Sequence, residues 1–463
     1  MPSLSRTLAQ WFLSANHEDI PDDVRRNTKV HVLDVIGLML SASRTEYGRI
    51  LREAVLQLGT GTQARVVGFG DVTNASNAVM INAALADSQD FDDTHNETHL
   101  HPGAHVIPAA LTFGELAGKN GREVLTVAAL GMELGARLAV AAPGMFVRNG
   151  FHSSAIVGTI VTTMIASRLL DLTLDQTVNA VGTAGSQAAG ILQCYADGTW
   201  TQGFHPGWIA HAGLTAAYLG RAGFTGPEEV LEGRHGLFRS HIQEPGYAFD
   251  FERTVDRLDT HWESRHISLK LYPAGCVIHP YLDAILHLYE HEGLRADDVE
   301  EIIMPISHHW VPIVCEPREV KVRPASEMGA RISLNYAVAE ALYYGRLGLD
   351  GFREENVRNP EILDLAARAR YTVDPENIPR RNFKGWVIVK TRDGRQLERV
   401  EYPWNKGHHD NPETPALIRG KFRETAGEAL GADQVARIID GVDQIEDTWN
   451  IARLIDLCVP AAG

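Results

Sequence analysis

The chain has 463 residues, of which 44% are hydrophobic and 22% charged, a composition typical of a soluble globular enzyme. Its length exceeds what one ordinary hydrophobic core serves, so we expect two domains. The formal net charge of −16 argues against nucleic acid and anionic membranes as partners, because binding to phosphates requires clustered Lys and Arg.

The cysteines indicate a reducing compartment. The four of them are widely scattered and form no CxxC pair, which is typical of free thiols rather than of a disulfide framework or a zinc ribbon. The first 15 residues lack the basic and long apolar regions of a signal peptide, and no run of the chain is apolar enough for a membrane span. We therefore expect a cytoplasmic protein.

The first part of the chain is predicted to be helical. Residues 24–42 carry apolar side chains at helical spacing, after start signals at residues 20–23. Later segments are rich in Ala, Gly, Thr and Val, whose small size lets helices pack closely at the centre of a bundle. These predicted helices span residues 124–142, 153–170, 174–192 and 209–222.

The pattern changes after about residue 265. Residues 299–306 and 385–391 look like strands, and a hairpin turn at 392–395 leads into a further predicted strand at 397–402. Helical patterns lie at 326–344 and 360–369, and an amphipathic helical tail at 414–455. The sequence thus predicts a mainly α protein: a helical domain of residues 1–265 and 405–463, and an α+β domain of residues 266–404.

Residues 90–105 hold three aspartates and four histidines in sixteen positions, between a small-residue helix and an apolar one. Buried carboxylates and imidazoles are costly unless they are paired, so this density near a core favours a functional site over a solvated acidic loop. Acid/base catalysis fits best, because a carboxylate beside a histidine can fix its tautomer and raise its basicity. Metal ligation by Asp90, Asp92, His95 and His99 is the alternative, at a spacing that matches no recognised zinc motif.

Three further blocks contain candidate residues. His152 precedes an apolar helix, where it is either a helix-entry residue or an anion contact. His205 lies in a polar segment, residues 199–208, before an Ala-rich helix. Lys270 and Cys276 lie at the predicted domain boundary, where we interpret the lysine as a carboxylate clamp and the cysteine as pocket-lining. Nucleotide-binding and serine-hydrolase motifs are absent from the sequence.

Taken together, these blocks resemble the 2-methylcitrate dehydratase family, also called MmgE/PrpD, which includes methylcitrate dehydratases, cis-aconitate decarboxylases and iminodisuccinate epimerases. The resemblance spans nearly the whole chain. It rests on five ordered stretches: DFDDTHNETHLHPGAHVIPAAL, GFHSSAIVG, FHPGWIAHAGLTAAYLGRAGFTGP with the following VLEGRHGLF, KLYPAGCVIHPYLDAI, and ISLNYAVAEALYYG.

The resemblance implies a large helical domain, built from the N-terminal part and the C-terminal tail, and a smaller α+β lid. It also implies a homodimer that needs no organic cofactor and moves a proton at a carbon next to a carboxylate, in a cleft between the domains. Carried over by position, it points to Asp90, Thr94, His101, His152 and Lys270. Tyr336 is a further carry-over.

The chain departs from the resemblance at Gln202. Decarboxylase- and epimerase-like members resemble one another in a lysine at this position, three residues before the histidine of the third block. Glutamine can donate a hydrogen bond to a carboxylate but supplies no charge. We therefore do not expect a tricarboxylate held as in the decarboxylases.

We expect a cofactor-free hydro-lyase, similar to 2-methylcitrate dehydratase, that acts on a small hydroxylated carboxylic acid. His101 would be the principal acid/base, assisted by Asp90, with Lys270 stabilising the charge that develops on deprotonation. The other site residues would contact or orient the substrate: Thr94, His152, Gln202, His205, Tyr336 and Cys276.

The alternatives are a decarboxylase or an epimerase at the same site. A different class altogether is a metal-dependent hydrolase that uses Asp92, His95 and His99. A binding protein without catalysis would not need so many ionisable groups in one place.

Overall fold

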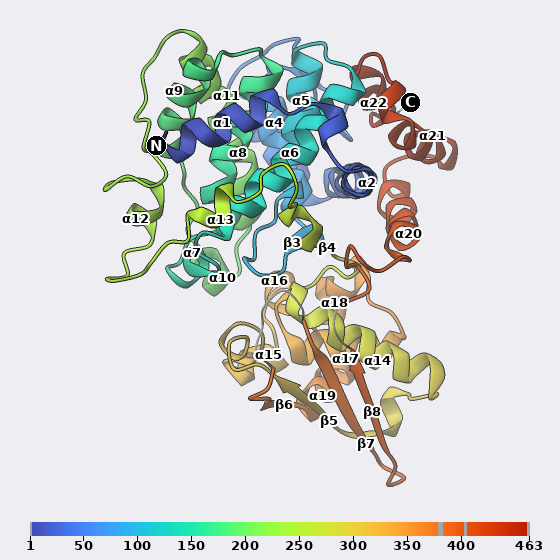
Figure 1. Ribbon diagram of the computed structural model, residues 1–463. Helices are drawn as coiled ribbons and strands as arrows, with labels where there is room; N and C mark the ends of the chain where they lie inside the picture. The colour runs from blue at the N-terminus through green and yellow to red at the C-terminus, as the bar shows by residue number, and fades with distance from the viewer. Residues whose placement is uncertain (1, 378–382, 402–404, 461–463) are drawn as a thin grey trace. The chain divides into compact units, whose positions relative to one another are not determined.

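The computed structural model describes residues 2–377, 383–401 and 405–460. Contacts divide the chain into two compact units. Unit 1 comprises residues 1–194, 200–267 and 415–463, and unit 2 comprises residues 195–199 and 268–414. The chain therefore enters unit 2 and returns, and its C-terminal helices belong to the same unit as its N-terminus (Figure 1).

The unit boundaries differ from the predicted domain boundaries in two segments. Residues 405–414 group with unit 2 rather than with the helical unit, because their backbone is bonded there. The Gly407 oxygen accepts from the Leu269 nitrogen at 2.9 Å, and the Lys406 nitrogen donates to Asp283 at 3.2 Å. Residues 195–199 also group with unit 2. The predicted boundary residue 404 lies outside the described residues.

Unit 1 is a bundle around α11, which contacts α4, α8 and α9. Its glycines allow this close packing: a Cβ atom added at Gly207 would lie 2.3 Å from the Met80 oxygen, and one at Gly213 would lie 2.3 Å from the Thr162 hydroxyl. The main helices are α2 (Asp22–Ser43), α4 (Ala75–Asp87), α5 (Gly103–Leu116), α6 (Gly121–Ala139), α8 (Ser153–Leu169), α9 (Leu174–Gly185) and α11 (Thr201–Arg221).

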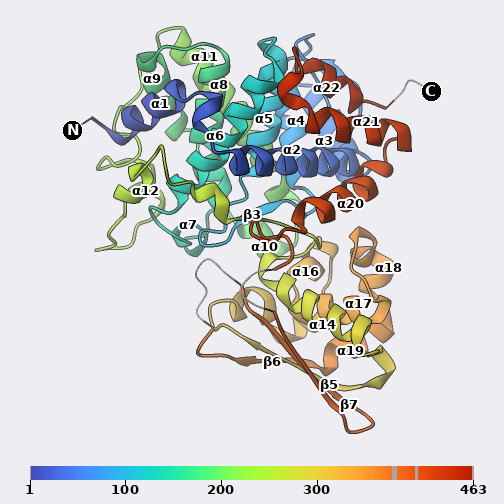
Figure 2. The same ribbon diagram turned by 45° about the vertical axis from the view of Figure 1, so that its right-hand side comes forward.

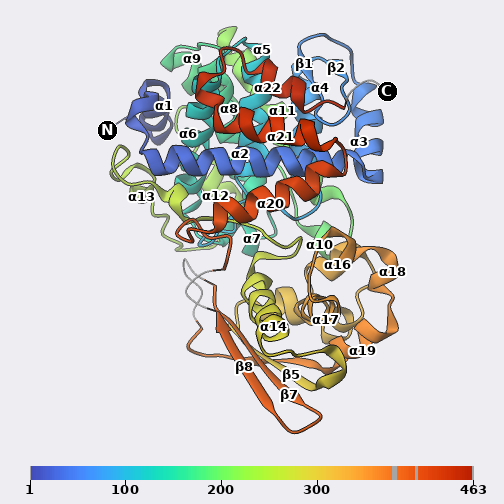
Figure 3. The same ribbon diagram turned by 90° about the vertical axis from the view of Figure 1, so that its right-hand side faces the viewer.

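Shorter elements complete unit 1. The C-terminal helices pack on early ones, α21 on α2 and α22 on α5, and Figure 3 shows α21 alongside α2. A two-stranded antiparallel sheet pairs β1 (Ala64–Arg65) with β2 (Val72–Thr73). The remaining helices are α1 (Leu4–Ser14), α3 (Glu46–Leu56), α7 (Met145–Arg148), α12 (Leu237–His241), α13 (Glu252–Val255), α20 (Thr414–Gly427), α21 (Ala432–Asp443) and α22 (Ala452–Leu457).

Two predicted helices have different bounds in the structure. The helix predicted at 174–192 ends at Gly185, and only the short α10 (Gln193–Asp197) follows. The helix predicted at 209–222 begins eight residues earlier, at Thr201, so His205 and Pro206 lie inside α11 and not in a connection. Proline inside a helix removes one backbone hydrogen bond. Here the first turn is held by tertiary contacts instead, with Gln202 bonded to Asp87 on α4.

Unit 2 contains a four-stranded sheet in the order β6-β5-β7-β8, in which only β5 and β6 run parallel. Helix α14 packs on β7 and β8, and α17 packs on α14 and α19; Figure 2 shows these helices beside the strands. The elements are β5 (Val299–Ile306), β6 (Ala369–Val373), β7 (Gly385–Thr391), β8 (Gln396–Glu401), α14 (His279–His291), α15 (Arg318–Val322), α16 (Glu327–Arg331), α17 (Leu334–Tyr344), α18 (Glu354–Val357) and α19 (Pro360–Arg368).

The predicted fold class, mainly α with an α+β part, is confirmed. The strands predicted at 299–306 and 385–391 match β5 and β7. Burial alternates along β7, as in a strand with one covered face, whereas the last three residues of β5 are all buried. The strand predicted at 397–402 corresponds to β8, and its last residue, Tyr402, lies outside the described residues. Within the described part of the chain, no helix is long and apolar enough to cross a membrane.

Candidate active site

The Asp/His segment forms an ordered loop between α4 and α5. Its first part is the short strand β3 (Asp93–His95), and His95 and Leu100 face each other across an antiparallel bridge. The His95 nitrogen donates to the Leu100 oxygen at 2.7 Å, and the His99 nitrogen donates to the His95 oxygen at 2.9 Å. His99 has a φ of 55°, a conformation that is uncommon outside glycine. The loop is thus tightly folded and brings His101 back beside β3.

His101 is held in one orientation by its ring nitrogen Nδ1. This atom lies 2.7 Å from the backbone oxygen of Asp93 and 3.1 Å from the hydroxyl of Thr94. A carbonyl oxygen only accepts, so Nδ1 carries the proton and donates it to Asp93. In the neutral ring Nε2 is then the basic nitrogen. The side chain is buried except for a 13% exposed fraction, so this loop presents one oriented base.

Asp93, whose backbone oxygen accepts from His101, is itself fixed by contacts of its carboxylate. Its carboxylate accepts from the Gly103 nitrogen, at the start of α5, at 2.8 Å, and pairs with His31 Nδ1 at 2.8 Å. Burial opposes ionisation of Asp93, but these bonds and the His31 charge hold the pKa of Asp93 below its usual value. The Asp93 backbone, and with it the acceptor for His101, is therefore fixed by two helices.

The carboxylate that the structure places beside the His101 ring is that of Asp92. It is buried, and its oxygen lies 3.6 Å from Nδ1. Asp90, which the sequence predicts to assist His101, is half-buried with a φ of 50°, and its assisting role stays a prediction. Thr94 was expected to contact substrate or orient Asp90; the structure shows its hydroxyl at His101 instead.

A buried lysine from the C-terminal tail holds the start of the loop. Lys421 on α20 donates to the Phe91 oxygen at 2.6 Å and pairs with Asp34 of α2 at 2.8 Å. Burial raises the pKa of Asp34 to about 6, and the lysine opposes this shift. Residues separated by more than three hundred positions thus meet behind one loop.

Three imidazoles stand in a row in unit 1. The ring of His152 lies 5.9 Å from that of His101 and 5.4 Å from that of His205, measured between centroids. His152 Nδ1 and His205 Nδ1 are 3.2 Å apart. Burial lowers the pKa of His205 to about 4, so this ring is neutral at pH 7. The structure therefore brings together three of the predicted site residues.

Gln202 lies one helical turn before His205 on α11. Both side chains are buried, and residues three apart share a helix face. The Gln202 amide nitrogen donates to the carboxylate of Asp87 at 3.0 Å. The amide that the sequence predicts to hold a substrate carboxylate therefore faces a protein carboxylate.

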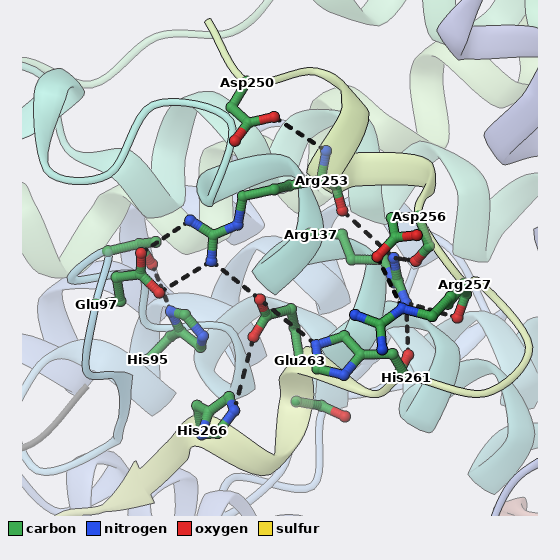
Figure 4. Close-up of polar contacts among 12 residues, drawn as sticks. His95, Glu97, Arg137, Asp250, Arg253, Asp256, Arg257, His261, Glu263 and His266 are labelled. Carbon is green, nitrogen blue, oxygen red and sulfur yellow. Dashed lines mark hydrogen bonds and ion pairs between the residues drawn. The ribbon is translucent and has the colours of Figure 1, made fainter. Parts of the chain in front are cut away.

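The outer side of the loop is tied to residues 253–266 by charged groups (Figure 4). Arg253 donates to both carboxylate oxygens of Glu97, at 2.9 and 3.0 Å, and to Glu263 at 3.1 Å. Figure 4 shows His261 and His266 approaching the same Glu263. Paired guanidinium and carboxylate groups of this kind fix geometry as well as adding stability.

A fully buried ion pair on α6 anchors this network. Arg137 and Glu133 have side-chain exposed fractions of 0%. Arg137 donates to backbone oxygens of the segment that follows α13, for example to that of Asp256 at 2.8 Å. Glu133 accepts from the backbone nitrogens of Glu263 and Ser264 at 3.0 and 2.8 Å. The segment that holds the loop tip is thus itself held by the bundle core.

The remaining predicted site residues belong to unit 2. Lys270 is buried and follows the short strand β4 (Ile267–Leu269), and Cys276 is half-buried. Tyr336 is fully buried in the core of unit 2, where its hydroxyl donates to the Gly351 oxygen at 3.0 Å and lies 3.2 Å from Glu340. The polar atom of Tyr336 is thus engaged inside the core of unit 2, and its role in the site stays a prediction.

The residues of the metal alternative are engaged otherwise. His95 Nδ1 is bonded to the Thr98 hydroxyl at 2.9 Å. Across the ranges that the structure describes, no group of three or more His, Cys, Asp or Glu side chains is arranged to hold a metal ion. The metal-dependent hydrolase stays a prediction that no group of described side chains supports.

Comparison with known proteins identifies the family. The model of the MmgE/PrpD N-terminal domain matches residues 6–250, and that of the MmgE/PrpD C-terminal domain matches residues 272–447. The chain belongs to the MmgE/PrpD family. The family resemblance seen in the sequence is thereby confirmed.

Relatives within the MmgE/PrpD family carry two kinds of name. A cis-aconitate decarboxylase of Aspergillus terreus is 27% identical over 97% of this chain and 94% of its own length, and one of Mus musculus is 26% identical over 96% and 91%. A mitochondrial 2-methylcitrate dehydratase of Yarrowia lipolytica is 22% identical over 68% of this chain and 62% of its own length. Both names describe lyases, so enzyme activity of this broad type is supported.

Some residues of the site were missed by sequence reasoning. His31, Asp34 and Lys421 lie on helices far from the loop in sequence, and Asp87 ends a small-residue helix. The signal of His31, Asp34 and Asp87 was weak but present, since each is a titratable residue within a mostly buried stretch, whereas Lys421 stands among charged residues and had no such signal. Such groups require a partner, but the sequence does not name it.

Proposed function

We propose that this MmgE/PrpD protein is a cofactor-free lyase in which His101 removes a proton from the carbon next to a carboxylate of a small carboxylic acid. The observation that carries the proposal is the contact from Nδ1 of His101 to the Asp93 oxygen at 2.7 Å. This bond orients the ring and leaves Nε2 as the base. The buried carboxylate of Asp92, 3.6 Å from the ring, favours the imidazolium that forms after proton transfer.

The chemistry balances without a cofactor. When His101 takes the proton, the C–H electron pair moves into the adjacent carboxylate and gives an enediolate, whose charge hydrogen-bond donors stabilise. In a dehydration, the enediolate then expels the hydroxyl group from the neighbouring carbon, and a proton from the protein converts it to water. The products are an unsaturated acid and water. The carboxylate-clamp role of Lys270 stays the prediction made from the sequence.

A hydro-lyase acting on a hydroxy acid is our first candidate. Its support is the bond from Gln202, which shares a face of α11 with His205, to the carboxylate of Asp87 on α4. A substrate carboxylate near this pair would meet a carboxylate of the same charge, which is unfavourable in a buried position. A hydroxyl group there would instead find acceptors. This favours a substrate that presents a neutral group at this point.

A decarboxylase is the second candidate, favoured by relatives of that name that match almost the whole chain. In that reaction the bond to a carboxyl carbon breaks, CO2 leaves, and His101 as imidazolium returns a proton to the carbon. The same oriented histidine then works as an acid instead of a base. An epimerase would return the proton to the opposite face.

Incubation with a panel of hydroxy and unsaturated di- and tricarboxylic acids in D2O, followed by NMR, distinguishes these reactions. A hydro-lyase loses the carbinol signal and gains a vinyl signal. A decarboxylase releases CO2 and incorporates one deuteron, and an epimerase exchanges the α-proton without other change. Absence of every one of these changes across the panel would overturn the proposal.

The variant Gln202→Lys separates the two lyase candidates. If this position contacts substrate, a lysine supplies a charge-assisted hydrogen bond, and affinity for di- or tricarboxylates rises about tenfold. Pairing of the new lysine with Asp87 would reduce the gain. Binding of a hydroxy acid with a neutral group at this point should weaken. If the affinity for every carboxylate tested is unchanged, Gln202 lies outside the pocket, and tricarboxylic acids are again candidate substrates.

The oligomeric state is also part of the proposal, as a homodimer. Trp200, directly before α11, and Trp208, on α11, keep exposed fractions of 52% and 38%. Large exposed aromatic side chains are enriched in subunit interfaces. The chain has a mass of 50.9 kDa, and light scattering after size exclusion should give twice this mass. A monomer at micromolar concentration would contradict the proposed homodimer.

A further inference from the structure

His152 and His205 are bonded to each other through like atoms. Their Nδ1 atoms lie 3.2 Å apart, and such a contact requires one nitrogen to carry a proton and the other to accept it. Both rings are buried, with exposed fractions of 2% and 6%. Protons on both Nδ1 atoms would put two donors face to face, and an additional proton on either Nε2 would place a charge on a buried ring, which is unfavourable. The pair acts as a neutral unit.

The surroundings disfavour a charged His152. It occupies the N-cap position of α8, and its backbone nitrogen donates to the Gly190 oxygen at 2.9 Å. The N-terminus of a helix carries a partial positive charge, which opposes an imidazolium at this place. Burial acts in the same direction at His205, whose pKa it lowers to about 4. The structure thus favours two neutral rings.

The direction of the bond decides what His152 offers to a ligand. If His205 is the donor, His152 is protonated on Nε2 and presents an N–H. If His205 is the acceptor, His152 presents a bare nitrogen on that side. The neighbouring His101 already offers a basic Nε2, and Asp92 and Asp93 contribute negative charge nearby. A site for an anionic substrate needs a donor among these acceptors.

We propose that His205 donates its Nδ1–H to His152 and thereby fixes His152 in the Nε2–H tautomer, as a neutral hydrogen-bond donor to the substrate. His101 and His152 are then adjacent imidazoles with opposite functions, one a base and the other a donor. The backbone oxygen of Asp93 sets the first tautomer and the Nδ1–H of His205 sets the second. His205 is accordingly a positioning residue and not the substrate contact that the sequence suggested.

This inference rests on the proposed function for the identity of the ligand, but the tautomers themselves can be measured without substrate. Protein labelled with 15N in its histidines should show, in NMR spectra at pH 7.5, the His152 ring with a proton on Nε2 and none on Nδ1. His101 should show the reverse. A His152 ring that is cationic, or protonated on Nδ1, would overturn the proposal even if the lyase reaction is demonstrated. Conversely, a substrate panel without turnover would leave this spectrum as an independent result.

Two nearly isosteric variants test the direction of the bond. In His205→Asn the amide occupies the place of Nδ1 and can still donate to His152. In His205→Asp the carboxylate in the same place can only accept. We expect His205→Asn to retain kcat within about threefold, and His205→Asp to lose about tenfold or more, because the His152 tautomer inverts. KM should change less than kcat, since donation matters most when charge develops on the substrate.

A third variant guards against loss of folding in the aspartate variant. His205→Gln places its amide at the position of Nε2 and so breaks the bond without introducing charge. We expect kcat to fall about 3- to 10-fold, together with a His152 spectrum that shows a mixture of tautomers. Equal activity of the Asn and Gln variants, with an unchanged His152 spectrum in both, would show that His205 does not set the tautomer.

Discussion

The two units bury polar groups in different ways. In unit 1 the buried groups around the loop are imidazoles, held by backbone atoms, by one another or by carboxylates, as at His101, His152 and His205. In unit 2 two buried carboxylates are bonded to phenols, Asp283 to Tyr272 at 2.8 Å and Glu340 to Tyr336 at 3.2 Å. Burial raises the pKa of Asp283 to about 6 and that of Glu340 to about 8.

This difference indicates where chemistry is located. A buried carboxyl that is bonded to a phenol is satisfied within the core and has little to offer a ligand. Oriented imidazoles beside ionised carboxylates can exchange protons near neutral pH. The comparison therefore assigns proton transfer to unit 1 and a structural role to the buried carboxylates of unit 2. The following predictions test it.

The largest expected effect is on activity, at His101. In His101→Asn the amide retains the bond to the Asp93 oxygen but removes the basic Nε2. Loss of a positioned acid/base should lower kcat/KM about 100- to 10,000-fold, while the circular dichroism spectrum and the midpoint of thermal unfolding stay close to those of the parent. An asparagine variant with parental turnover would remove His101 from its role. His291→Asn, at an exposed position on α14, is the matched control.

The buried ion pair of unit 1 should matter far more for stability than an exposed one in unit 2. Arg137→Met leaves the buried Glu133 without its guanidinium and should cost about 3–5 kcal/mol of the free energy of unfolding. Arg346→Met removes an exposed pair with Asp350 and should cost about 0–1 kcal/mol. Urea unfolding followed by hydrogen exchange in each unit measures both. Similar losses from the two variants would contradict the comparison.

Acidification from pH 7.5 to 5 should affect the units in opposite directions. Burial lowers the pKa of His105 and His205 to about 4. Between pH 6.5 and pH 4 these two rings therefore bind protons in the unfolded chain but not in folded unit 1. The stability that they give unit 1 above pH 6.5 is lost as the pH falls towards 4. Each ring contributes about 1–2 kcal/mol over this range. In unit 2 the raised pKa of Glu340 means that stability increases as pH falls from 8 towards 4.5.

Hydrogen exchange of each unit, corrected for the intrinsic effect of pH, checks this prediction. Protection should decrease in α5 and α11 and increase in α17 at the lower pH. The raised pKa values of Asp34 and Glu115, both caused by burial, act against the trend in unit 1. Parallel changes in both units would show that the buried groups do not govern the pH dependence of local stability.

The smallest expected effects come from removing one hydroxyl in each unit. Thr94→Val removes an oxygen 3.1 Å from His101 Nδ1 and should lower kcat/KM severalfold. Tyr336→Phe removes the phenol from the unit 2 core and should cost about 1 kcal/mol of stability, with kcat/KM unchanged. Loss of activity in Tyr336→Phe that exceeds that in Thr94→Val would reverse the assignment of the two residues.

The sequence predicted elements well where the pattern is local. The strands at 299–306 and 385–391 are short runs rich in Val and Ile, which is a property of neighbouring positions. The start of α11 was missed, since His205-Pro206-Gly207 resembles a connection. The contacts of Gln202 with Asp87 and of Gly207 with Met80 hold this turn in the helix, and such contacts have no local signature.

In the site, too, the sequence predicted the local pattern but not the tertiary contacts. By itself, the sequence determined that acid/base groups cluster at residues 90–105, because charged and imidazole groups next to apolar helices require partners. Only the tertiary structure decided which partner each group has: the Asp93 oxygen for His101, His205 for His152, and Asp87 for Gln202. Hydrogen bonds act over about 3 Å, and the helices that bring these atoms together are distant in the chain. The proton positions that define a base and a donor are therefore a consequence of packing.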